Sequence, residues 1–203
     1  MAQTLGRLFL VRHGSTDWAE THRFTGRTDL PLNVRGEENA RRLAVRLAGI
    51  AFSRVFSSPL QRARRTCELA GFAAVAQIDP DLAEWDYGRF EGRFSDEIHR
   101  QRPDWDLFRD GAPGGESPGE VAARADRFIN KVRQIGGDVA GFSSAHISRV
   151  IVSRWIGLGP EAAAKFLCST ASVSVLSYEH SVQQPAIELW NDDGTILRPG
   201  SMG

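Results

Sequence analysis

The chain has 203 residues, of which 41% are hydrophobic, so it is long enough to bury one sizeable core. Its 25 basic and 25 acidic side chains cancel, which excludes a global field directed at nucleic acid or at an anionic membrane. Two cysteines are too few for a disulfide framework, and no apolar run reaches the length of a membrane span or a secretory leader. These properties predict one soluble, cytoplasmic domain over residues 1–203.

Strands and helices alternate in the first part of the chain. Leu8–Val11 is a short apolar run typical of a buried strand. Asn33 is a helix cap, followed by acidic residues in the first turn and by an apolar face that ends before Gly49. Further along, we expect a strand at 55–56, a helix at 61–70 and a strand around Ile78.

Residues 80–118 interrupt this alternation. They are rich in proline, glycine, tryptophan and acidic residues, and so long an irregular stretch within a compact domain is more often a functional lid than a connector. We therefore predict an irregular segment that covers the substrate.

The alternation resumes at Ser117, which opens a capping box with Pro118 at the first helical position. Beyond this helix we expect a strand at 139–142, a helix at 147–155 and a final strand pair at 173–178 and 186–190. The pattern predicts an α/β fold with a mostly parallel sheet.

Polar side chains follow three of the predicted strands. Arg12 and His13 come directly after the first strand, Arg62 follows the second, and Ser144 and His146 follow the strand at 139–142. If these strands are parallel, the three junctions open at one edge of the sheet, where such folds bind ligands. Two arginines can then hold one tetrahedral anion and keep a neighbouring imidazole neutral and nucleophilic.

Glu84 lies among apolar and aromatic neighbours, which predicts a raised carboxyl pKa and a role as general acid. Each candidate also has a simpler interpretation. A single glutamate is more often an exposed carboxylate, and Trp85, Tyr87 and Phe90 are ordinarily core residues. Other residues fit no motif and are interpreted as structural: an exposed helix stripe of Arg41, Arg42 and Arg46, and the histidines His22, His99 and His180.

Five ordered segments resemble the histidine phosphatase superfamily, which includes the cofactor-dependent phosphoglycerate mutases. They are residues 10–16 (LVRHGST), 24–32 (FTGRTDLPL), 57–63 (SSPLQRA), 82–92 (LAEWDYGRFEG) and 109–117 (RDGAPGGES). The last two resemble most closely a phosphatase branch that includes mycobacterial acid phosphatase and fungal sedoheptulose bisphosphatase. The resemblance implies a three-layer α/β/α sandwich of the phosphoglycerate mutase type.

The resemblance also implies a two-step hydrolysis of phosphomonoesters of small metabolites, such as sugar phosphates, without a metal or cofactor. In this scheme His13 takes the phosphoryl group, Arg12 and Arg62 hold its oxygens, and Glu84 protonates the leaving group and later activates water. The resemblance places three more residues in the substrate pocket: Ser15, Thr25 and Gly26. The expected partner is a small phosphorylated substrate, and a homodimer is left open as the assembly.

One position departs from the family pattern. Relatives of this branch read Ser-His-Gly-His after the later strand, and the alignment puts Ser144 in the place of the catalytic histidine and His146 in that of the second one. Ser144 can still donate one hydrogen bond to the phosphoryl group, and His146 can reach in from the first helical turn. A phosphate-binding pseudoenzyme is therefore the alternative. A phosphoglycerate mutase is less favoured, because Ala19 and Trp85 replace residues typical of mutases.

Overall fold

The computed structural model describes residues 5–195, and these residues form one six-stranded sheet in the order β3-β2-β4-β1-β5-β6. Neighbouring strands among the first four are parallel, whereas β5 runs antiparallel to both β1 and β6. The strands are β1 (Leu8–Arg12), β2 (Arg54–Ser57), β3 (Ala76–Ile78), β4 (Val139–Ser143), β5 (Val173–Tyr178) and β6 (Pro185–Asp192). The predicted, mostly parallel sheet is confirmed.

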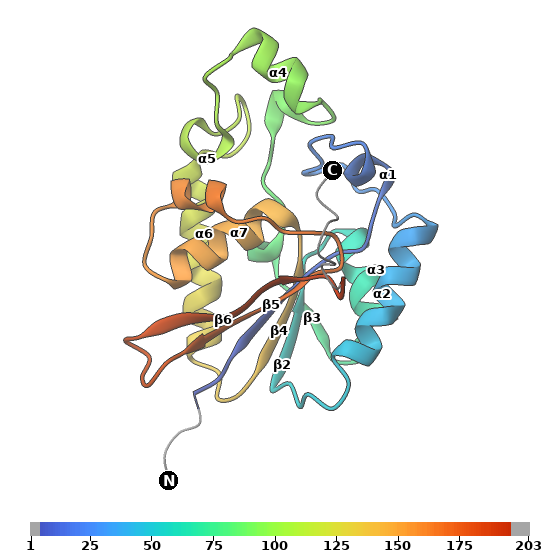
Figure 1. Ribbon diagram of the computed structural model, residues 1–203, viewed down its shortest axis with the longest axis vertical. Helices are drawn as coiled ribbons and strands as arrows, with labels where there is room; N and C mark the ends of the chain where they lie inside the picture. The colour runs from blue at the N-terminus through green and yellow to red at the C-terminus, as the bar shows by residue number, and fades with distance from the viewer. Residues whose placement is uncertain (1–4, 196–203) are drawn as a thin grey trace.

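Helices cover both faces of this sheet (Figure 1). The helices α2 (Val34–Arg46) and α3 (Gln61–Leu69) lie on one face, and α6 (Pro118–Arg133) and α7 (Ala145–Trp155) lie on the other. Alternate residues of β1 enter the two cores accordingly, because successive side chains of a strand point to opposite faces. The result is the three-layer α/β/α sandwich that the resemblance implied.

Two helix starts form as their sequences predict. The side-chain oxygen of Asn33 accepts a hydrogen bond from the Gly36 N–H at 2.8 Å. Ser117 and Glu120 form a reciprocal capping box around Pro118, with the Ser117 N–H donating to the Glu120 carboxylate at 2.8 Å. No helix within residues 5–195 combines the length and the apolarity that a bilayer crossing requires.

The prediction that residues 80–118 are irregular is wrong in part. The segment contains the 3₁₀ helices η1 (Pro80–Leu82) and η2 (Gly88–Phe90) and the helices α4 (Ser95–Gln101) and α5 (Leu107–Asp110). Helices this short depend on tertiary packing, so their sequences carry little periodicity. Two further short helices, α1 (Asp17–Glu20) and η3 (Pro160–Lys165), also escaped prediction.

The same segment adds an aromatic core beyond the carboxyl ends of the parallel strands. Figure 1 shows α4 and α5 lying beyond this edge of the sheet. Its buried aromatic residues are Trp85, Tyr87, Phe90, Trp105 and Phe108, which confirms that the first three belong to the core. These side chains continue the core between the sheet and α6, and Tyr87 among them lines the cavity described next.

Candidate active site

The strand-to-helix junctions predicted to carry chemistry meet at one edge of the sheet. The strands β2, β4 and β1 are neighbours, with Arg12 of β1 paired to Ser143 of β4. A cavity of about 1370 Å³ opens at this edge. Residues from several elements line it, among them Arg12, His13, Thr25, Glu84, Tyr87, His146 and Arg149.

His13 is held in a single hydrogen-bonding state. The residue is 5% exposed, and Nδ1 lies 2.7 Å from the carbonyl oxygen of Gly14. Because a carbonyl only accepts, Nδ1 carries the proton and Nε2 keeps its lone pair. Burial lowers the pKa of His13 well below its usual value, and the charges of Arg62 and Arg12 lower it further. His13 is therefore a neutral imidazole with Nε2 available as a nucleophile.

The two predicted phosphate-binding arginines, Arg12 and Arg62, both act on His13 through their charges but differ in how many hydrogen bonds they make to the protein. Arg62 is fully buried, and its terminal nitrogens donate to the backbone carbonyls of Thr25, Gly26 and Thr28 at 2.9–3.0 Å. Arg12 lines the cavity and donates from Nη1 to the Cys168 carbonyl. In both guanidinium groups Nε is buried without a partner among the described residues. Each therefore retains a donor that nothing in the described chain satisfies.

The predicted raised pKa of Glu84 is wrong. Burial does oppose ionisation, but the positive charge that His146 carries when protonated at acidic pH and three backbone N–H donors outweigh it and lower the pKa of the carboxyl. The donors are the amides of Trp85, His146 and Ile147, at 2.9, 3.1 and 3.0 Å. Two of them belong to the first turn of α7, so the carboxylate also caps that helix. The sequence showed the apolar neighbours of Glu84 but not these amides.

His146 faces the same cavity from the first turn of α7. Its Nδ1 lies 2.5 Å from the hydroxyl of Tyr87, and its backbone N–H holds Glu84. Burial lowers the pKa of His146 to about 4, and the opposing charge of Glu84 does not restore it. His146 is thus neutral near pH 7. Tyr87 was assigned only to the core, although its position within the segment 82–92 indicated a role beside Glu84.

Ser144, which the resemblance puts in the place of a catalytic histidine, is buried at the N-cap of α7. Its hydroxyl makes no capping hydrogen bond and has no partner among the described residues. Glu84 takes over the cap that a serine usually supplies at this position.

The three predicted pocket residues have different surroundings. Thr25 lines the cavity. The Ser15 hydroxyl instead donates to Glu20 at 3.1 Å, and the Gly26 N–H donates to Glu91 at 2.9 Å. The Gly26 contact stabilises the loop whose carbonyls hold Arg62, whereas the Ser15 contact joins the turn after His13 to α1.

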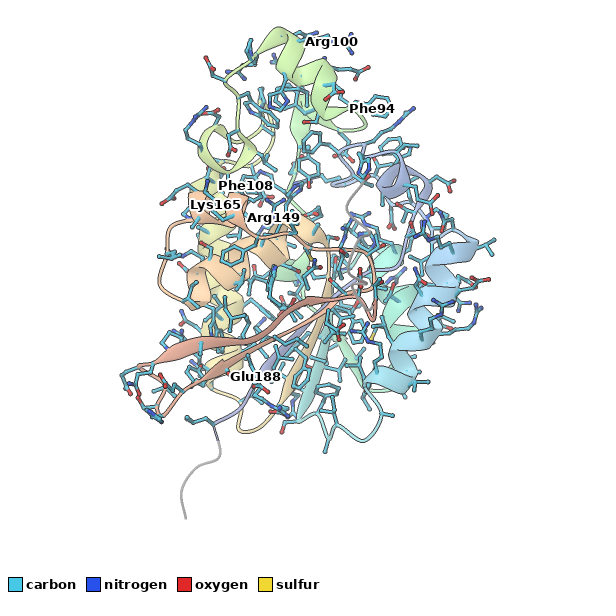
Figure 2. The ribbon with its side chains drawn as sticks, viewed as in Figure 1. Phe94, Arg100, Phe108, Arg149, Lys165 and Glu188 are labelled. Carbon is cyan, nitrogen blue, oxygen red and sulfur yellow. The ribbon has the colours of Figure 1, made fainter. Side chains whose placement is uncertain are left out.

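Several cavity residues were not predicted. Arg149 lies one turn after His146 on α7, which the spacing of three residues could have indicated. Its guanidinium stacks 4.5 Å over the ring of Phe108, and Figure 2 labels both side chains in this part of the molecule. His22, Arg42 and Arg46, which were interpreted as structural or exposed, also line the cavity. Within residues 5–195 no group of three or more potential metal ligands gathers.

The sequence profile of the Histidine phosphatase superfamily (branch 1) matches residues 8–193. This chain belongs to the histidine phosphatase superfamily. Within that superfamily it is 37% identical to the acid phosphatase of Mycobacterium tuberculosis over 186 residues, which cover 89% of this chain and 91% of that protein. It is 28% identical to sedoheptulose 1,7-bisphosphatase of Saccharomyces cerevisiae, over 90% and 92% of the two chains.

A solved structure of an open reading frame product from Mycobacterium tuberculosis superposes with a TM-score of 0.87. The two sequences are 32% identical, and the superposition covers 92% of this chain and 97% of the other. The predicted family and fold class are confirmed.

Proposed function

We propose that this chain is a phosphatase that hydrolyses phosphomonoesters of small metabolites through a phosphohistidine on His13. The observation that carries the proposal is the state of that imidazole, which is neutral, protonated at Nδ1 and flanked by two arginines. The superfamily and its relatives named as phosphatases support hydrolysis of phosphate esters.

In the first step, Nε2 of His13 attacks phosphorus and forms an N–P bond while the P–O bond to the leaving alcohol breaks. In this proposal the unpartnered Nε–H groups of Arg12 and Arg62 hold phosphoryl oxygens as charge develops on them. Glu84 gives its proton to the departing oxygen. In the second step, water gives a proton to Glu84 and attacks phosphorus, which breaks the N–P bond and releases inorganic phosphate.

The low pKa of Glu84 means that the carboxyl is ionised in the empty cavity. Negative charge on a bound phosphate raises the pKa of a neighbouring carboxyl, because like charges disfavour the ionised form. The second pKa of a phosphate ester is about 6, so part of the substrate binds as a monoanion with one proton on its phosphate group. That proton can pass to the Glu84 carboxylate. Substrate binding thus converts Glu84 into an acid.

The cavity lining favours small, acidic phosphorylated metabolites. Arginines outnumber carboxylates along it: Arg12, Arg23, Arg35, Arg42, Arg46 and Arg149 face Glu38, Glu84 and Asp193. Arg12, Arg23 and Arg149 form no ion pair with a carboxylate among residues 5–195, so an anionic substrate supplies their countercharge.

The test is steady-state turnover of p-nitrophenyl phosphate, sugar phosphates and phosphoglycerates by the wild type, H13A and H180A. His180 is an exposed histidine and serves as the matched control. We expect wild-type turnover to fall at least about 10³-fold in H13A and to stay unchanged in H180A. Acid-labile, base-stable label from ³²P substrate is expected on the wild type alone.

Turnover retained by H13A would overturn the mechanism. An absence of turnover with every ester, together with binding of inorganic phosphate, would instead support the phosphate-binding pseudoenzyme that Ser144 suggests.

A further inference from the structure

Tyr87 and His146 form a hydrogen bond whose direction can be deduced. The Tyr87 side chain is 1% exposed, and His146 Nδ1 is the only partner of its hydroxyl among residues 5–195. Burial raises the pKa of Tyr87 well above its usual value, so the phenol keeps its proton. Among the described residues that proton has no acceptor other than Nδ1, and leaving it unpaired at a buried side chain is costly. Tyr87 therefore donates to His146.

This direction fixes the tautomer of His146. An imidazole that accepts at Nδ1 and is neutral carries its proton on Nε2. Nε2 has no hydrogen-bond partner among the described residues, and the side chain is part of the cavity lining. The free N–H of His146 is therefore available to a molecule bound in the cavity.

Aromatic packing holds the ring of His146 in place. Phe24 stacks on it at 6.0 Å between centroids, and Phe108 meets it edge to face at 5.4 Å. The Tyr87 ring closes a third side at 5.7 Å. The ionisable groups whose charges act on this ring come from four segments: Glu84, Arg149, Arg12 and Asp106. The imidazole is thus both oriented and kept neutral by its surroundings.

We propose that Tyr87 is a positioning residue that holds His146 as the Nε2–H tautomer, and that this neutral histidine donates one hydrogen bond to a phosphoryl oxygen of the substrate. The proposal rests on the proposed phosphatase function. It assigns to His146 the donor role left vacant where Ser144 replaces a histidine, because the Ser144 hydroxyl is buried and His146 lines the cavity.

A neutral donor suits this cavity better than an imidazolium. Burial disfavours a positive charge on His146 and outweighs the attraction of Glu84, and the charges of Arg149 and Arg12 disfavour it further. A preorganised N–H still stabilises the charge that develops on the phosphoryl oxygens, and removing one such donor commonly costs about 10²–10³-fold in rate.

Long-range ¹H–¹⁵N correlation spectra report the tautomer of each histidine directly. The chain has five histidines, and the signals that are missing in H146A belong to His146. We expect the wild-type His146 spectrum to report a protonated Nε2 and an accepting Nδ1. In Y87F, which removes the hydroxyl and keeps the ring, we expect a mixture of tautomers. Y178F is the matched control, because Tyr178 packs on Trp155 outside the cavity.

The kinetic test distinguishes a role of Tyr87 in orienting His146 from a general effect of Tyr87 on the fold. We expect Y87F to lower kcat about tenfold or more with circular dichroism unchanged, and Y178F to leave kcat at the wild-type value. H146Q keeps a neutral N–H close to the position of Nε2, whereas H146N does not, so H146Q is expected to retain more activity than H146N. Adding Y87F to H146A is expected to cause no further loss, because the hydroxyl acts through the histidine.

The proposal is overturned if Y87F changes neither the tautomer nor kcat, or if H146Q is as slow as H146N and H146A. The NMR measurement of the tautomer needs no turnover, so its result does not depend on whether the chain is a phosphatase. Failure of the phosphatase proposal is recognised separately by H13A retaining activity.

Discussion

His13 and His146 lie in one cavity in opposite hydrogen-bonding states. His13 donates from Nδ1 to the Gly14 carbonyl, which leaves the lone pair of the ring on Nε2. His146 accepts at Nδ1 from Tyr87, which leaves Nε2–H as a donor. The environment of each ring, rather than the residue type, thus separates the two roles.

At the same scale, Ser144 is expected to contribute little. Its hydroxyl is buried without a partner, so S144A removes an unsatisfied polar group and is expected to change the free energy of unfolding by no more than about 1 kcal/mol. We also expect kcat to stay within a few fold of the wild-type value. Urea unfolding and turnover of p-nitrophenyl phosphate measure the two effects. A loss of about 10²-fold in kcat would show instead that Ser144 binds the phosphoryl group.

At the scale of elements, the backbone at the start of α2 is in close contact with the backbone of the loop that follows His13. A Cβ atom on Gly36 would overlap the carbonyl oxygen of Ser15, and one on Gly14 would overlap that of Gly36. The Gly14 N–H also donates to Thr66 of α3 at 3.0 Å. Two helices therefore set the position of His13, and glycine is required because backbone meets backbone.

We expect G36A to lower both stability and activity. Alanine in a helix is normally favoured over glycine by about 1 kcal/mol, but here overpacking against backbone costs about 1–3 kcal/mol and displaces the His13 loop. Thermal unfolding and kcat/KM measure the change.

The matched control is G119A, because Gly119 lies in the first turn of α6 with no contact nearer than 4.0 Å for an added Cβ. This variant is expected to be at least as stable as the wild type. Equal behaviour of G36A and G119A would contradict the close approach at α2.

At the scale of the molecule, folding buries two imidazoles in their neutral form, and the cost of doing so depends on pH. The pKa of His146 is about 4 in the folded chain against 6.5 for the ordinary residue. Between these values the unfolded chain binds a proton that the folded chain does not, so stability falls as pH falls. His13, whose pKa is also lowered, acts in the same direction.

We expect the free energy of unfolding to decrease from about pH 6.5 to about pH 4, with His146 contributing up to about 3 kcal/mol. In H146Q, which has no group to titrate at this position, the decrease is expected to be smaller. Urea unfolding at several pH values measures both slopes. Equal slopes in the two proteins would contradict burial of a neutral His146.

Much of this arrangement was predictable from local patterns. The strand at Leu8–Val11, the caps at Asn33 and Ser117 and the order of the main elements follow from periodicity and capping, which depend on neighbouring residues. The junction residues His13 and His146 could be placed at one sheet edge, because parallel strands end on the same side. The short helices α4 and α5 could not be predicted, since packing rather than propensity stabilises them.

The sequence by itself determined the family, the alternation of strands and helices, and which residue types stand at the ends of the strands. Only the tertiary structure decided their chemical states. The amides of α7 that ionise Glu84 and the tyrosine that fixes His146 come from segments about sixty residues apart, with separations of 63 and 59 positions. A proton's position depends on burial and on the nearest donor or acceptor in space, and neither quantity is encoded in local sequence.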